Sequence, residues 1–152
     1  MTLPLKIIVQ EQLHVANEPM EIMTVLGSCI AVCLWDQKCR VAGMNHYLLP
    51  LWNGEGFKSL KYGNVSIKRL VDEMIFNGAD KSHIVAKIFG GATINLGSAF
   101  SVGDRNISIA EDVLSDLNIP IVARDVGGTL GRKVIISSVD GSVYVKTSVY
   151  QG

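Results

Sequence analysis

The sequence of 152 residues has no long apolar run and no excess of charge of either sign. No stretch reaches the roughly 20 apolar residues that a membrane-spanning helix needs, and the first residues lack the charged and apolar regions of a secretory signal. Lysine and arginine together number 14, as do aspartate and glutamate, which argues against bulk electrostatic binding to nucleic acid or to an anionic membrane. We therefore expect a cytoplasmic protein that folds as one domain over residues 1–152, without membrane insertion.

Cysteine is scarce as well. The three cysteines are an odd number and form no paired C-x-x-C motif, so the sequence does not indicate a disulfide framework. A regular strand would separate Cys29 and Cys33 too widely for easy chelation together with Cys39 and His46, so we expect free thiols and no bound metal or cofactor. Cys33 is expected in the core, and Cys39 in an exposed turn.

The sequence has no internal repeat, no low-complexity tract and no G-x-G-x-x-G nucleotide fingerprint. Its glycines gather instead in three runs, at residues 90–91, 102–106 and 125–132. These runs can be turns at strand ends, loops around an active site whose N–H groups form an oxyanion hole, or a phosphate-binding module. Arg105 and Arg132 beside them can bind a partner carboxylate, or pair with neighbouring aspartates and loop carbonyls.

Hydrophobic periodicity predicts an α+β fold with largely antiparallel strand pairing. Apolar and β-branched segments predict about eight strands, at residues 5–10, 21–26, 29–35, 41–48, 83–89, 119–125, 133–139 and 142–148. Two amphipathic stretches predict helices, at residues 64–76 and 106–117, the first of them ending at Gly78. Residues 36–40 are predicted to form a hairpin turn, and residues 49–62 a loop at the substrate entrance or packed on the body.

A cysteine and a histidine come together in the predicted hairpin. Cys29 follows the tight approach Gly27-Ser28, and His46 lies on the returning strand. A turn centred near residues 37–38 places Cys29 opposite a position close to His46. An imidazole beside a thiol is the smallest arrangement that activates a cysteine nucleophile. The alternative is that Cys29 is a small buried hydrophobe in an apolar strand.

Several further segments carry a family resemblance that runs in unbroken order over roughly residues 20–148. They are LGSCIAVCLWD, Asn45-His46, Pro50, KIFGGA (residues 87–92), VGDRN (residues 102–106) and IPIVARDVGGTLGR (residues 119–132). With these segments the sequence resembles CheD, the chemoreceptor glutamine deamidases of bacterial and archaeal chemotaxis.

The resemblance implies a cysteine hydrolase that converts receptor glutamine side chains to glutamate and releases ammonia, with methylesterase activity on the same sites as a related possibility. It implies Cys29 as the nucleophile, His46 as the general base and an upstream threonine as the third member. Met23 stands where some family members carry that threonine, and Thr24 is the nearest candidate. The implied fold is a mixed, largely antiparallel β-sandwich with flanking helices, similar to the catalytic domain of cytotoxic necrotizing factor toxins.

The implied partners are the cytoplasmic helices of chemoreceptors, as substrate, and CheC, a phosphatase of the phosphorylated response regulator; a monomer is the default. In the expected mechanism, His46 deprotonates Cys29, or the two rest as a thiolate–imidazolium pair, before a thioester forms. Candidate substrate or oxyanion contacts are Gly27, Ser28, Gly90 and Gly91. Two rival functions stay open: an adaptor that binds CheC or receptor with weak or no catalysis, and a small-ligand module that binds phosphate.

Overall fold

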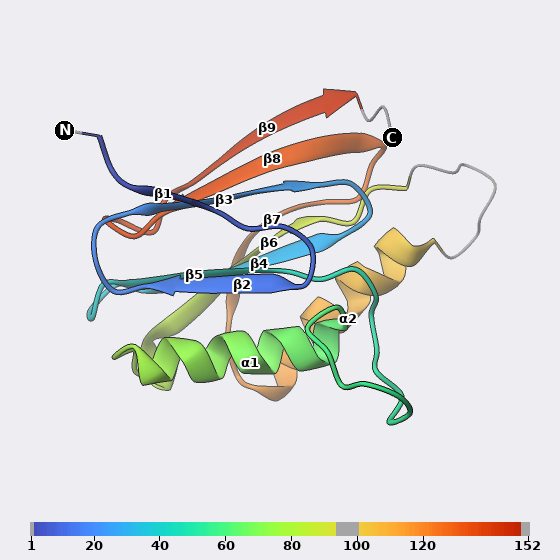
Figure 1. The fold of residues 1–152 in the computed structure, drawn as a ribbon, viewed down its shortest axis with the longest axis horizontal. Coiled ribbons are helices and arrows are strands. Elements are labelled where there is room, and N and C mark those ends of the chain that lie inside the picture. Colours follow the sequence, from blue (N-terminus) through green and yellow to red (C-terminus); the bar gives the residue numbers. More distant parts are fainter. Residues whose placement is uncertain (1, 94–100, 150–152) are drawn as a thin grey trace.

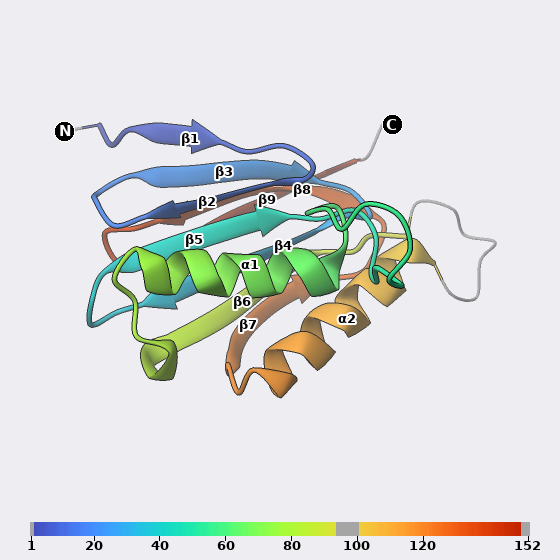
Figure 2. The same ribbon diagram turned by 60° about the horizontal axis from the view of Figure 1, so that its bottom comes forward.

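The computed structural model describes residues 2–93 and 101–149. Two β-sheets face each other, and two helices cover the outer side of one of them (Figures 1 and 2). The strands are β1 (Leu5–Ile7), β2 (Gln12–Ala16), β3 (Glu21–Leu26), β4 (Ile30–Asp36), β5 (Val41–His46), β6 (Ile84–Gly90), β7 (Ile121–Val126), β8 (Leu130–Ser137) and β9 (Val143–Val149). The helices are α1 (Gly63–Phe76), α2 (Val102–Asp116) and the short 3₁₀ helix η1 (Lys81–His83).

Strand pairing is mixed, with antiparallel pairs in the majority. One sheet has the order β1-β3-β8-β9 and the other the order β2-β5-β4-β6-β7. Only the β1–β3 and β6–β7 pairs of these sheets are parallel. The predicted α+β class and the predicted sandwich with flanking helices are therefore confirmed. Neither α1 nor α2 combines the length and apolar character that a bilayer-spanning helix requires, within the residues that the structure describes.

Two apolar cores hold these layers together. One lies between the five-stranded sheet and the two helices, and the other lies between the two sheets. Strand β4 contributes to both cores and is buried along its whole length, because helices cover one of its faces and the second sheet covers the other. Burial of both faces thus explains why the sequence of β4 is a continuous apolar run that does not alternate with polar residues.

The structure differs from the predicted elements at two places. The predicted strand at residues 5–10 ends early, at Ile7, and is followed by strand β2, which the sequence did not predict. The tight turn between the two strands contains Glu11, which has a positive φ of 66°. Helix α2 begins at Val102, so the segment 102–106 is the first helical turn and not a glycine loop. The Ser101 side chain caps this helix by accepting a hydrogen bond from the Asp104 N–H.

The other predicted elements agree with the structure to within a few residues. The hairpin turn between β4 and β5 spans residues 37–40, and residues 49–62 contain neither helix nor strand. Helix α1 ends where predicted, because Gly78 adopts a φ of +105° just beyond it.

Candidate active site

The register of β4 against β5 brings Cys29 and His46 to one end of the hairpin. Ile30 and Tyr47 exchange two backbone hydrogen bonds of 3.1 and 3.0 Å. Cys29 and His46 each precede one of these residues, so they are diagonal neighbours, which lie roughly 7–8 Å apart in such pairs. Both side chains face the opposite sheet: Cys29 packs on the inter-sheet core, and His46 bonds to Thr24 of β3.

The hydrogen bonds of Thr24 determine which nitrogen of His46 carries the proton. The Thr24 hydroxyl donates to the carbonyl oxygen of Ile8 at 2.8 Å and lies 2.7 Å from His46 Nδ1. A hydroxyl has one proton to donate, and the Ile8 carbonyl can only accept. The hydroxyl must therefore accept from an Nδ1–H, which leaves the lone pair of His46 on Nε2.

Strand alternation explains why Thr24, and not Met23, occupies this position. Along β3, Ile22, Thr24 and Leu26 are buried between the sheets, whereas Met23 and Val25 lie on the opposite face. A residue at position 23 cannot reach His46 without shifting the whole strand by one residue. The structure thus brings together Thr24 and His46, the two residues whose pairing the sequence left open.

Burial favours the neutral forms of Cys29 and His46. It raises the pKa of the Cys29 thiol above its ordinary range and lowers the pKa of His46 from 6.5 to about 4. In the described part of the chain, His46 Nε2 is buried and has no hydrogen-bond partner. Cys29 Sγ therefore makes no hydrogen bond to Nε2 in this structure, and burial favours a neutral thiol and a neutral imidazole over a resting thiolate–imidazolium pair.

The Gly90-Gly91 turn holds the backbone of Cys29. The Gly91 N–H donates to the Cys29 carbonyl at 2.9 Å, and the Ala92 N–H donates to the Gly27 carbonyl at 3.0 Å. A Cβ atom on Gly90 would lie 2.2 Å from the Cys29 carbonyl oxygen, so only glycine permits this approach. The N–H groups of Ser28 and Cys29 donate to none of the other described residues.

Two buried asparagines support the site, and sequence reasoning assigned a role to neither. The Asn106 amide donates to the carbonyls of Ser28 (3.1 Å) and Leu48 (2.9 Å), and so joins the two segments next to Cys29 and His46. The Asn45 side chain accepts from the Val32 N–H at 2.7 Å, in place of a backbone carbonyl, one residue before His46. Both asparagines belong to segments that carry the family resemblance, VGDRN and Asn45-His46, and this is the sequence signal that could have identified them.

Comparison with known proteins shows the family of the chain. A family model described as CheD chemotactic sensory transduction matches residues 48–147. A protein of Sulfurimonas denitrificans is 50% identical over 144 residues, which cover 93% of this chain and 92% of the relative. The chain belongs to the CheD family.

The relatives also cover the segment before residue 48. The Sulfurimonas protein and one of Trichlorobacter lovleyi, 49% identical over 86% of this chain and 82% of its own length, are both named "Probable chemoreceptor glutamine deamidase CheD". Among solved structures, the Bacillus licheniformis hypothetical protein YfiH has a TM-score of 0.51 at 14% identity. That match covers 77% of this chain and about half (49%) of YfiH, and it supports the fold alone.

The predicted ambiguity of Arg132 is settled by its contacts. Arg132 is 5% exposed, and its guanidinium donates to Asp125 at 3.2 Å and to the carbonyls of Gly90 (3.3 Å) and Gly127 (2.9 Å). It therefore links β8 to the two glycine turns and is not free to bind a ligand. Cys33 is buried, with its pKa raised to about 12 by burial, and Cys39 is exposed, both as predicted.

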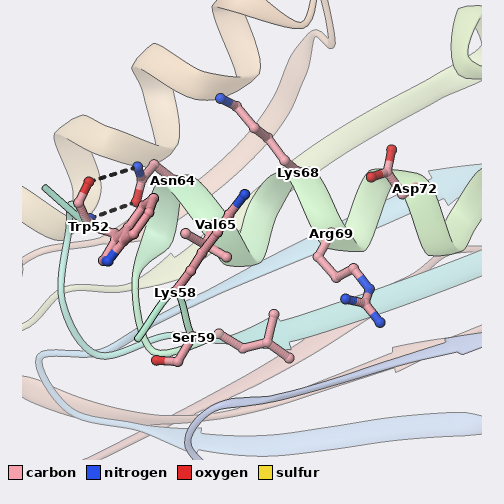
Figure 3. Close-up of a pocket in the computed structure, with 9 residues that line it drawn as sticks. Trp52, Lys58, Ser59, Asn64, Val65, Lys68, Arg69 and Asp72 are labelled. Carbon is pink, nitrogen blue, oxygen red and sulfur yellow. Dashed lines mark hydrogen bonds between the residues drawn. The ribbon is translucent and has the colours of Figure 1, made fainter. Parts of the chain in front are cut away.

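Two of the cavities in the described part of the chain bear on this site, and Cys29 lines neither of them. The larger, of about 540 Å³, lies between the 49–62 loop and α1 and is lined by Trp52, Lys68 and Arg69, but not by Cys29 or His46 (Figure 3). There the Asn64 side chain holds the backbone of Trp52: its oxygen accepts from the Trp52 N–H at 2.9 Å, and its NH₂ group donates to the Trp52 carbonyl at 3.4 Å. The smaller, of about 290 Å³, is lined by residues 7–10, Thr24, Val25 and His46, and it alone of the two leads to the histidine.

Proposed function

We propose that this protein hydrolyses glutamine side chains of chemoreceptors to glutamate and ammonia. The observation that carries the proposal is the Thr24–His46 hydrogen bond, which leaves Nε2 of a buried, neutral imidazole unpartnered on the strand beside Cys29. Two relatives of 50% and 49% identity are named for this activity. We place the enzyme in the cytoplasm, where the receptor helices that it modifies are exposed.

The first half-reaction forms a thioester. His46 Nε2 takes the proton of the Cys29 thiol while Sγ attacks the Cδ atom of the substrate amide. The amide oxygen becomes an oxyanion that the N–H groups of Ser28 and Cys29 stabilise. The imidazolium, held by Thr24, then gives its proton to the amide nitrogen, the C–N bond breaks, and ammonia leaves.

The second half-reaction returns the enzyme to its starting state. Nε2 takes a proton from a water molecule, whose oxygen attacks the thioester carbonyl. The same N–H groups stabilise the second tetrahedral intermediate. The C–S bond breaks, the thiolate recovers the proton from Nε2, and the product leaves as a carboxylic acid, whose proton passes in solution to the released ammonia to give glutamate and ammonium. One water is consumed for each ammonia, and His46 carries the protons that move between the substrate, the water and Cys29.

The surface around His46 suits a helical substrate. Ile7, Val9 and Val25 line the smaller cavity and are exposed by 54%, 57% and 64%. An exposed apolar rim of this kind packs against apolar side chains that flank a glutamine on a helix surface. From the family resemblance we also expect CheC as a second partner, and we expect the chain to be a monomer.

Mass spectrometry of a receptor cytoplasmic fragment tests the proposal. We expect wild-type protein to replace NH₂ by OH at particular glutamines, with release of an equal amount of ammonia. Cys29→Ala and His46→Asn should leave the fragment unchanged while their circular dichroism matches that of wild type. Turnover that survives in Cys29→Ala would remove the cysteine from the mechanism.

An adaptor without catalysis is the rival outcome of the same experiment. Met23, which stands where some family members carry threonine, is the sequence feature that keeps the adaptor open. Thr24 occupies the position beside Nδ1 in its place, so this feature no longer argues for a lost activity. Binding of the fragment by both wild type and Cys29→Ala, without deamidation by either, would establish the adaptor.

A further inference from the structure

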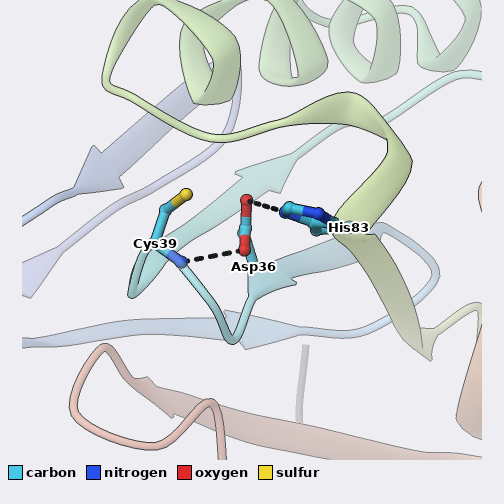
Figure 4. A group of neighbouring side chains, drawn as sticks. All are labelled: Asp36, Cys39 and His83. Carbon is cyan, nitrogen blue, oxygen red and sulfur yellow. Dashed lines mark hydrogen bonds and ion pairs between the residues drawn. The ribbon is translucent and has the colours of Figure 1, made fainter.

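A second cysteine–histidine pair lies at the far end of the β4–β5 hairpin. Asp36 ends β4, Cys39 lies in the turn that follows, and His83 ends η1, directly before β6. Each residue offers one possible ligand atom: a carboxylate oxygen of Asp36, Sγ of Cys39 and a ring nitrogen of His83. These three atoms all lie within 4.8 Å of one another (Figure 4). The fold thus gathers three different donor types from two separate turns.

We propose that Asp36, Cys39 and His83 form a zinc site. Thiolate sulfur, imidazole nitrogen and carboxylate oxygen are the protein ligands that Zn²⁺ takes in tetrahedral sites. A surface depression lined by Gln37, Lys38 and His83 adjoins these residues, so water could supply a fourth ligand.

One buried ring nitrogen of His83 lacks a hydrogen bond to any described residue and faces the Asp36 carboxylate, with which it can form only a long ion pair. His83 Nδ1 is buried and has no hydrogen-bond partner among the described residues. It lies 3.7 Å from Asp36 Oδ2, which is too far for a hydrogen bond. Two ligands at zinc distances of about 2.1 Å in a tetrahedron lie about 3.4 Å apart, so an ion between these two atoms needs a movement of only a few tenths of an ångström.

The carboxylate is held in place for such a role. Asp36 is fully buried; Oδ1 accepts from the N–H groups of Lys38 and Cys39 at 3.0 Å, and Oδ2 accepts from the Asp80 N–H at 2.8 Å. Burial would raise its pKa, but these backbone donors together lower it. Asp36 is therefore a fixed anion whose ligand atom is oriented by the backbone.

The thiol gains from a cation at this place. Cys39 Sγ lies close to the fixed carboxylate of Asp36, which would attract a cation to this place. A zinc ion would displace the thiol proton, and the two anionic ligands would balance its charge. Asp80, whose carboxylate lies 3.9 Å from His83 Nε2, is placed to orient the ring from outside the metal's shell.

Zinc at this site would act on the fold and not on catalysis. It would join the β4–β5 turn to the turn that leads into β6, and so pin the central strands of the five-stranded sheet. Strand β4 has seven residues, and at about 3.3 Å per residue the site lies roughly 20 Å from Cys29.

Cobalt and zinc titrations test the site in a protein that lacks the competing thiol. The starting protein is Cys29→Ser, because Cys29 and His46 are the other cysteine and histidine that the fold brings close. After chelator treatment, it should bind one Co²⁺ per chain with a sulfur-to-cobalt charge-transfer band, and one Zn²⁺ should replace the cobalt. Zinc should also raise its melting temperature and release one proton.

Second substitutions locate the ligands. Cys29→Ser/Cys39→Ser and Cys29→Ser/His83→Gln should lose the band and the zinc-dependent rise in melting temperature, although both retain Cys33. Because Cys39 and His83 lie at the surface, both proteins should fold. A band that persists in either double variant, a starting protein that binds no cobalt, or binding without any rise in melting temperature would each overturn the zinc site.

Discussion

A cysteine and a histidine lie close together at each end of the β4–β5 hairpin, and the two pairs differ in burial and in the charge of the third side chain beside them. At one end, His46 is 3% exposed and bonds to the hydroxyl of Thr24. At the other end, Cys39 is exposed and His83 is partly exposed, beside the buried carboxylate of Asp36. The side chains are of the same two types, yet the third group is neutral at one end and anionic at the other.

The difference shows that the third group and the degree of burial decide what such a pair can do. A hydroxyl orients the imidazole without adding charge, so the proton can move between sulfur and nitrogen during a reaction. A fixed carboxylate beside a thiol opposes thiolate formation unless a cation is present. We therefore propose that the same pair of residue types serves proton transfer at one end and cation binding at the other.

Removal of the neutral third group should have the largest effect. Thr24→Val deprives Nδ1–H of its acceptor and frees the other tautomer, so we expect deamidation to fall by up to about 10,000-fold, the loss seen when a triad histidine loses its orienting group. Thr24→Ser keeps the hydroxyl and should retain most activity. The rate of ammonia release from a receptor fragment measures both variants; equal rates in Thr24→Val and Thr24→Ser would contradict the role of the hydroxyl.

The buried imidazole should make stability depend on pH in a defined window. Because burial lowers the pKa of His46 from 6.5 to about 4, the unfolded chain binds a proton in this range and the folded chain does not. The contribution of neutral His46 to the free energy of unfolding is therefore fully present above about pH 6.5. It falls by about 3 kcal/mol as the pH is lowered toward 4.

His46→Asn isolates this contribution. Urea unfolding of wild type and His46→Asn between pH 4 and 7 should give a smaller pH dependence for the variant. The acid limb of wild-type kcat/KM should lie near pH 4 and not near 6.5, because His46 acts as a neutral base. Parallel stability profiles of the two proteins would contradict the burial of an uncharged imidazole.

The glycine turn beside Cys29 can be compared with a glycine of the same conformation elsewhere. Gly90 and Gly78 have φ values of +106° and +105°, but an added Cβ meets the Cys29 carbonyl oxygen at Gly90 and nothing within 4 Å at Gly78. Both Gly→Ala variants should lose stability from backbone strain. Only Gly90→Ala should also displace Cys29 and lower kcat/KM, by about 100-fold. A similar loss of kcat/KM in Gly78→Ala would show that strain alone is responsible.

The smallest expected effect concerns the apolar rim. Val25→Glu places a charge where we propose that the receptor helix packs, so KM should rise by about tenfold while kcat changes little. Val122 on β7 is similarly exposed, by 55% compared with 64% for Val25, and does not line the His46 cavity. Val122→Glu is therefore the matched control and should leave KM unchanged.

Local patterns predicted much of the fold. The strand at residues 21–26, the turn before Val41, and helix α1 with its end at Gly78 follow from alternation, turn chemistry and helical periodicity. Strand β2 could not be predicted in this way, because a short strand of mixed polarity is stabilised by its pairing with β5. The start of α2 was missed because Gly103 looked like a turn residue, whereas it lets the helix approach the Gly91 backbone closely.

The sequence by itself predicted that Cys29 and His46 lie near each other, since the apolar run with its polar turn predicts a hairpin whose returning strand carries His46, but it left the register of that hairpin open. Only the tertiary structure decided the third residue, because Thr24 reaches His46 from the other sheet and a sequence carries no record of how two sheets stack. The same holds for Asn106, and for the meeting of Asp36, Cys39 and His83. Pairing along a hairpin follows from local periodicity, whereas contacts between layers depend on how the whole core packs.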